Sequence, residues 1–71
     1  MSFSFNEINT LIRMSINPRF KVAKTAINEL NDILTDNGAA IAKIASEIAG
    51  SAERNVILDE DIVNAYYALF L

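Results

Sequence analysis

The chain has 71 residues, of which 52% are hydrophobic, a formal net charge of −3, and neither cysteine nor histidine. A chain this short buries too little surface to be comfortably stable alone, so its apolar excess favours an obligate oligomer. Disulfides and thiolate metal sites are excluded, and serine- or cysteine-type nucleophiles would lack their usual base. We therefore expect one domain over residues 1–71, with no cofactor, metal, small-molecule substrate or enzymatic activity.

The sequence also predicts no association with a membrane. The N-terminal residues lack the basic region followed by an apolar region that marks a signal peptide. The longest uncharged run near the end, residues 62–71, is far too short to span a bilayer.

A short helix is predicted over about residues 5–15. Ser4 and Glu7 have the spacing of a capping box, in which each side chain accepts a hydrogen bond from the backbone N–H of the other residue. The helix should end before Asn17-Pro18, because a residue that precedes proline disfavours the α region.

The segment that follows has two interpretations. Asn17 could cap a new helix that has Pro18 at its first position. Alternatively, residues 17–21 could form an extended loop, with Phe20 and Val22 in a short β-like piece. Local propensity does not decide between the two.

One long helix is predicted from about Lys21 to about Ser51. Apolar residues recur there at spacings of three, four and seven, which puts them on one helix face. They are Ile27, Leu30, Leu34, Ile41, Ala45, Ile48 and Ala52. A helix of about 30 residues is roughly 45 Å long, more than the rest of so short a chain can cover. We expect a second copy of the chain to cover it.

Asn37-Gly38 is the one feature that argues for a break in this helix, giving a helical hairpin instead. The dipeptide favours turns, and glycine inside a helix costs about 1 kcal/mol relative to alanine. A break would normally reset the apolar phase, yet Leu34 and Ile41 keep the seven-residue spacing across it. The preserved phase favours a continuous helix.

The last part of the chain predicts a connection followed by a third helix. Residues 55–58 have the β-branched content of a very short strand. Asp59 is placed as an N-cap, and a helix from Glu60 to the end would have acids at the positive end of its dipole. Its apolar stripe consists of Ile62, Ala65, Tyr66, Leu69 and Phe70.

Residues of the third helix would also suit two other kinds of site. Asp59, Glu60 and Asp61 could hold a hard cation, but acids in a first helical turn account for them better. The aromatic residues of the third helix could stack on nucleic-acid bases, but core and interface positions account for them better. These aromatic residues are Tyr66, Tyr67 and Phe70.

The cations are concentrated in one short segment. Residues 13–24 contain four of the six cations and no acid, whereas residues 25–71 contain two cations and eight acids. The four cations are Arg13, Arg19, Lys21 and Lys24. An anionic partner should dock at this segment, although a merely solvated basic face would have the same composition.

The order of short helix, loop, long helix, loop and short helix resembles the histone fold. From Gly38 onward the sequence is similar to the archaeal histones, which lack tails. Ile41-Ala42 matches their Ile-Ala in the middle of the long helix. Residues 54–57 stand where that family has Arg-Lys-Thr-Ile in its second loop, and residues 60–62 match the Glu-Asp-Ile that opens its third helix. The resemblance covers about residues 16–71 and implies an all-α histone fold that forms an intertwined dimer.

The resemblance also implies roles for individual residues. Arg54 and Asp61 occupy the positions of an arginine–aspartate pair that clamps the fold. DNA contacts are implied for an arginine of the first helix, for the first loop and for the second loop of the partner. Arg13 corresponds to the helix-one arginine, either Arg19 or Lys21 to the loop-one arginine, and Asn55 to a lysine of the second loop. With Lys24 from the same basic segment, the predicted DNA contacts are Arg13, Arg19, Lys21, Lys24 and Asn55. The long helices should cross near residues 38–41, in an interface that includes Leu30, Leu34, Gly38, Ile41 and Ile48.

Two functions follow as hypotheses. The first is a sequence-independent, architectural protein that binds double-stranded DNA as a dimer and bends or bridges it weakly, because Asn55 and Val56 replace the lysine and threonine of the family's second loop. The alternative is a histone-fold dimerisation module that binds another protein and little or no DNA. The partner subunit would be a second copy or a paralogue, with a tetramer as a further form. The expected location is cytoplasmic and nucleoid-associated, in a prokaryote or a virus.

Overall fold

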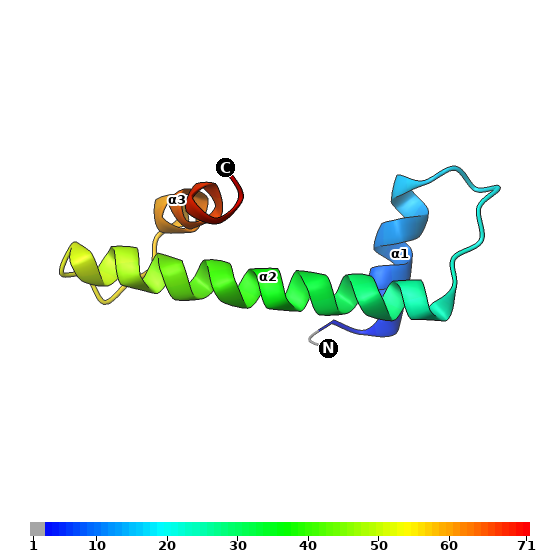
Figure 1. Cartoon of the computed structure of the whole chain (residues 1–71), viewed down its shortest axis with the longest axis horizontal. Coiled ribbons are helices and arrows are strands. Elements are labelled where there is room, and N and C mark those ends of the chain that lie inside the picture. The colour runs from blue at the N-terminus through cyan, green and yellow to red at the C-terminus, as the bar shows by residue number, and fades with distance from the viewer. Residues whose placement is uncertain (1–2) are drawn as a thin grey trace. The chain divides into compact units, whose positions relative to one another are not determined.

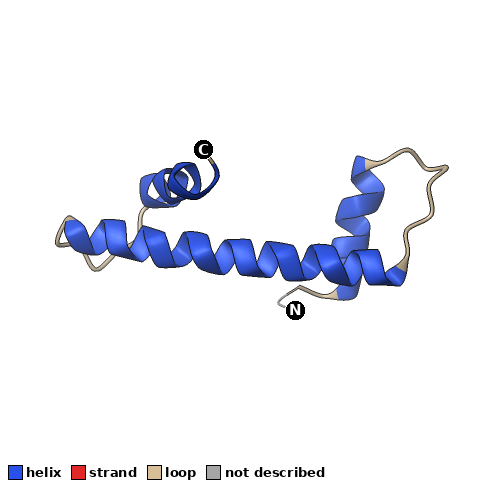
Figure 2. Ribbon diagram, in the orientation of Figure 1, coloured by secondary structure: helices blue, strands red, loops and turns tan. Residues whose placement is uncertain are grey.

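The computed structural model describes residues 3–71, which form three α-helices and no strand (Figures 1 and 2). The helices are α1 (Phe5–Ser15), α2 (Lys24–Ser51) and α3 (Asp59–Phe70). The predicted all-α class and the order of short, long and short helix are confirmed. The chain divides into two compact units, Met1–Asp36 and Asn37–Leu71, and each contains one half of α2.

The strand-like pieces expected near residues 20–22 and 55–58 are not present in the described part of the chain. Both segments are loops. A strand needs a neighbouring strand to take its backbone hydrogen bonds, and β-branched content does not supply one.

In the first unit, α1 begins at the predicted capping box. The Ser4 backbone N–H donates to Glu7 Oε1 at 2.9 Å, and the Glu7 backbone N–H donates to Ser4 Oγ at 3.1 Å. Hydrogen bonding of the Glu7 carboxylate to the Ser4 backbone, and next to the Ser4 side chain, lowers the pKa of Glu7 below its ordinary value. The bounds of α1 agree with the predicted residues 5–15. Local sequence is enough here because both partners of the cap lie within one turn.

The core of the first unit contains a buried polar residue. Its buried apolar side chains are Ile8 and Ile27. Asn31, one helical turn after Ile27, is completely buried as well. The Asn31 amide donates to the Phe3 carbonyl at 2.7 Å, and its Oδ1 accepts from the Phe3 N–H at 3.2 Å. Asn31 therefore attaches the segment before α1 to α2, and its polar atoms are satisfied despite their burial.

The connection between α1 and α2 is a loop that opens with a tight turn. Asn17 Oδ1 accepts from the Arg19 N–H at 3.0 Å, and the Asn17 carbonyl accepts from the Phe20 N–H at 3.1 Å. Pro18 lies inside this turn, so a helix that starts there is excluded. Because the turn and its continuation occupy residues 17–23, α2 begins at Lys24, three residues later than predicted.

The long helix is continuous through Asn37-Gly38, so the hairpin alternative is wrong. Gly38 does not have a positive φ, which means that it serves as an ordinary helical residue and not as a helix terminator. The helix ends in the second unit, where Glu53 has a φ of 57°. The Arg54 N–H donates to the Ala49 carbonyl and the Glu53 N–H to the Gly50 carbonyl, both at 2.9 Å. This is the Schellman arrangement, with Glu53 in the left-handed position that glycine usually takes.

In the second unit, α3 begins one residue earlier than predicted. Leu58 is its N-cap, so the prediction that Asp59 caps the helix is wrong. The carboxylate that caps the first turn belongs to Asp61, whose Oδ2 accepts from the Leu58 N–H at 2.8 Å. Small side chains fill the core of this unit. Ala45 and Ala49 of α2 and Ala65 of α3 are all at most 3% exposed, which lets helices approach closely.

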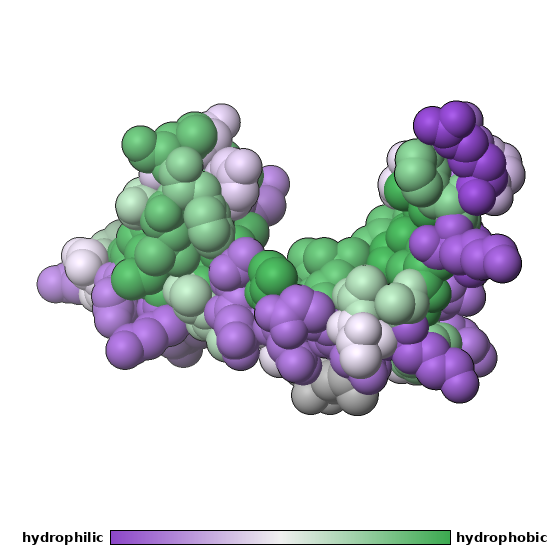
Figure 3. Space-filling view, turned by 45° about the vertical axis from the view of Figure 1, so that its right-hand side comes forward, coloured by the Kyte–Doolittle hydropathy of each residue, from purple (hydrophilic) through white to green (hydrophobic). Residues whose placement is uncertain are grey.

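Each unit leaves large apolar side chains exposed. In the first unit these are Phe3, Phe5, Leu11, Met14, Phe20 and Ile33. In the second unit they are Val56, Ile57, Leu58, Ile62, Val63, Tyr66, Tyr67, Leu69, Phe70 and Leu71. Figure 3 shows apolar surface, in green, over much of α3. Of the apolar stripe predicted for the third helix, Ala65 alone is buried.

Candidate functional site

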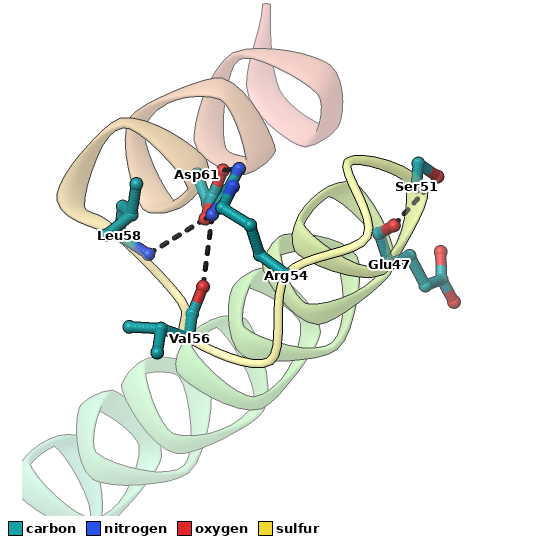
Figure 4. Close-up of polar contacts among 6 residues, drawn as sticks. All are labelled: Glu47, Ser51, Arg54, Val56, Leu58 and Asp61. Atoms are coloured by element: carbon teal, nitrogen blue, oxygen red, sulfur yellow. Dashed lines mark hydrogen bonds and ion pairs between the residues drawn. The ribbon is translucent and has the colours of Figure 1, made fainter.

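An ion pair joins the loop after α2 to the first turn of α3 (Figure 4). Arg54 Nη1 donates to Asp61 Oδ2 at 2.7 Å, and Nη2 donates to Asp61 Oδ1 at 2.9 Å, which makes the pair bidentate. Nη1 also donates to the Val56 carbonyl at 3.0 Å. Residues 54 and 61 are brought together because the chain turns back between them. This is the pair that the histone resemblance implied.

The environment of the pair favours both charges. The Asp61 side chain is 1% exposed and that of Arg54 is 31% exposed. Hydrogen bonds from Arg54, and next the one from the Leu58 N–H, lower the pKa of Asp61 to about 2. The hydrogen bonds to Asp61 likewise raise the pKa of Arg54. Asp61 thus stays ionised at neutral pH with both oxygens occupied, so the pair holds a loop to a helix and offers no group for proton transfer.

The four cations predicted to contact DNA are all exposed, and they lie at the end of α1, in the following loop and at the start of α2. Arg13 Nη1 donates to the Phe20 carbonyl at 3.2 Å. The Arg19 guanidinium lies over the Phe20 ring, 5.0 Å from its centre. Among residues 3–71 the single salt bridge is the one between Arg54 and Asp61, so the basic segment is not neutralised by acids of its own chain.

The second loop is poor in free cations. Asn55 and Val56 are exposed and uncharged, and Arg54 is held by Asp61. The residues around the loop are acidic and exposed: Glu53, Asp59 and Glu60. Asn55 remains a predicted DNA contact that could offer phosphate an amide but no charge.

The residues predicted for a dimer interface are incompletely covered by the chain itself. Leu30, Leu34, Ile41 and Ile48 are half-buried, and Gly38 is exposed. Apart from its chain neighbours and the nearby backbone of α2, a Cβ built on Gly38 would meet no atom of residues 3–71 within 4 Å, and the same is true of Gly50. The face is therefore open in the single chain.

The aromatic residues of α3 form a small exposed cluster. The Tyr66 ring centre is 5.3 Å from that of Phe70 and 5.9 Å from that of Tyr67, both tilted. All three side chains are more than 40% exposed. These residues are therefore not core residues of the single chain. Whether they lie in an interface remains a prediction.

Other kinds of site receive no support from the described residues. They contain no group of three acidic residues that could hold a metal ion, so Asp59, Glu60 and Asp61 do not converge as ligands. Residues 3–71 form no pocket. None of the helices in this range is long and apolar enough to cross a membrane.

Sequence reasoning missed two structural contacts. Asn31 lies four residues after Ile27 and three before Leu34, so the helical repeat already placed it on the apolar face. It was not counted among the core residues because its side chain is a polar amide. The contact between Arg13 and the Phe20 carbonyl left no signal in the sequence, because a carbonyl is present at every residue.

No protein-family model matches the chain, and comparisons with curated proteins and with solved structures found no match. What the chain can do therefore rests on the chemistry of its own residues.

Proposed function

We propose that this chain is a histone-fold protein that dimerises and binds double-stranded DNA without sequence preference, associated with a nucleoid. The observation that carries the DNA part is the basic segment. Four exposed cations lie within twelve residues, and no acid occurs between Glu7 and Glu29. Such a local field attracts phosphate even though the whole chain is acidic.

Support for the dimer comes from the small core. The buried apolar side chains of residues 3–71 are Ile8, Ile27, Ala45, Ala49 and Ala65, and three of these five are alanines. Many large apolar side chains remain exposed instead, which a stable monomer rarely tolerates. A second copy that covers the open faces of α2 and α3 would bury them. The resemblance to histones implies an intertwined dimer, in which the two long helices cross near residues 38–41.

The chemistry of the basic segment fits phosphate contacts. Arg19, Lys21 and Lys24 are exposed and can donate to phosphate oxygens, which carry no sequence information. Two or three such charges from each chain would neutralise roughly four to six phosphates per dimer, giving a slope of log affinity against log salt of about −3.6 to −5.4. Because the second loop adds no free cation, we expect weak binding at physiological salt, with bending or bridging and not stable wrapping.

The test is a gel shift with random-sequence duplex DNA at about 50 mM salt. Wild type should shift the duplex, and the double variant Lys21→Glu with Lys24→Glu should not, although it should keep the mass and helix content of the wild type. Lys43→Glu, which changes one exposed cation outside the basic segment, is the control and should bind almost as wild type. Absence of a shift by wild type at this salt would contradict DNA binding.

A protein-interaction module is the second candidate, favoured by the second loop. There Arg54 is engaged with Asp61, and the exposed charges around it are acidic. If the chain is a dimer in solution by light scattering but wild type does not shift DNA at low salt, this candidate takes the place of the first.

A further inference from the structure

Three interactions converge on Phe20, in the middle of the basic segment. Its N–H closes the turn by donating to Asn17, its carbonyl accepts from Arg13 Nη1 at 3.2 Å, and its ring lies under the guanidinium of Arg19. The turn is reinforced by the Asn17 side chain, which accepts from the Arg19 N–H. Of these, the Arg13 contact alone ties the loop to α1.

The position of Arg13 suits a structural role. It lies in the last turn of α1, where its positive charge interacts favourably with the negative end of the helix dipole. From there it spans seven residues to reach the carbonyl of Phe20. Lys21 and Lys24, by contrast, make no hydrogen bond or ion pair within residues 3–71 through their side chains, so their charges remain available to a ligand.

We propose that Arg13 is a positioning residue for the DNA contact and not a phosphate ligand. This inference rests on the proposed DNA-binding function. By holding the loop against α1, Arg13 keeps the backbone that carries Arg19 and Lys21 in one conformation before DNA arrives. A loop that is already ordered loses less conformational freedom on binding, so affinity rises without an added phosphate contact.

Salt dependence separates the two roles, because each lost phosphate contact flattens the slope by about 0.9. Affinity for a duplex would be measured by fluorescence anisotropy from about 50 to 200 mM salt for wild type, Arg13→Ala and Lys24→Ala. Lys24→Ala is the contact control and should flatten the slope by about 1.8 per dimer. Arg13→Ala should weaken binding by roughly three- to tenfold, the range expected for one hydrogen bond, with the slope unchanged to within about 0.5.

A second variant removes loop order without changing charge. Asn17→Ala deletes the side chain that accepts from the Arg19 N–H and should likewise weaken binding at an unchanged slope. Amide hydrogen exchange without DNA supplies an independent readout, because residues 17–23 should exchange faster in Arg13→Ala while α2 keeps its protection.

The outcomes are distinct. A slope that flattens in Arg13→Ala as much as in Lys24→Ala, or loop exchange that does not change, would overturn the positioning role and leave the proposed function in place. A wild type that does not bind DNA at low salt would overturn both.

Discussion

At the scale of single residues, Asp61 is a buried charge that depends on two neighbouring groups. Its carboxylate is almost fully buried, and it accepts hydrogen bonds from Arg54 and from the Leu58 N–H. One side chain thereby holds the second loop and caps α3. Buried charge is tolerated only while its partners remain, so loss of either partner leaves an ion without adequate solvation.

Replacement of Arg54 should therefore destabilise the protein strongly. Arg54→Ala leaves Asp61 buried without its cation, and we expect the thermal midpoint to fall by at least roughly 5 °C. Lys43→Ala removes an exposed cation from α2 and should shift it by no more than about 2 °C. Both would be followed by circular dichroism at equal protein concentration. Equal shifts in the two variants would mean that the ion pair does not stabilise the fold.

The same carboxylate predicts the response to acid. The folded-state pKa of Asp61 is about 2, below its ordinary value of 3.8. As pH falls, the unfolded chain takes up this proton first, so the stability that Asp61 provides is complete above about pH 4 and is lost as pH falls toward 2. The thermal midpoint of wild type should drop across this window. Asp61→Asn should start lower at neutral pH and fall less steeply over the same range; parallel curves would show that other carboxylates govern the response.

At the scale of elements, α2 contains a glycine that no packing contact within residues 3–71 explains. Glycine at position 38 lowers the helix propensity of α2, and no other segment of residues 3–71 comes within 4 Å of a Cβ built there. The proposed dimer would give Gly38 a role, because a second long helix could approach closely at a residue without a side chain.

Two glycine substitutions test this explanation. In an isolated chain, Gly38→Ala and Gly50→Ala should each stabilise α2 by up to about 1 kcal/mol, because both positions are helical, exposed and open. If two long helices cross at Gly38, its added methyl group should instead weaken the dimer, while Gly50→Ala should still stabilise it. Thermal midpoints and sedimentation of both variants at equal concentration make the comparison. Stabilisation by both would place the crossing elsewhere or exclude it.

At the scale of the whole molecule, residues 3–71 leave most of their large apolar side chains exposed. The exposed side chains are large and aliphatic or aromatic, whereas the buried ones are few and mostly small. Burial of large apolar groups is the dominant stabilising term in folding. If the proposed dimer buries the exposed side chains, folding and association should therefore be coupled.

Concentration dependence follows from such coupling. If the folded state is a dimer, the thermal midpoint should rise as protein concentration is raised over about a hundredfold range, because association draws the equilibrium toward the folded pair. Light scattering over the same range should give the mass of two chains. A folded monomer at micromolar concentration with a constant midpoint would contradict the proposed dimer.

The sequence by itself determined the number and order of the helices, the start of the first and the continuity of the second. The start of α1 follows from Ser4 and Glu7, and the continuity of α2 follows from the phase that Leu34 and Ile41 preserve across Gly38. These signals suffice because caps and helical repeats act between residues only a few positions apart. The pair of Arg54 and Asp61 was predictable through its resemblance to a known pattern, not through local rules.

Tertiary structure decided the contacts that join separate segments. Asn31 bonds to Phe3 across 28 residues, and Arg13 reaches the carbonyl of Phe20 across seven. Each depends on how the chain turns back on itself, and an amide, a carboxylate or a guanidinium can bond to any backbone group brought within reach. Residue type states what such a group can bind, and packing alone determines which partner lies within reach.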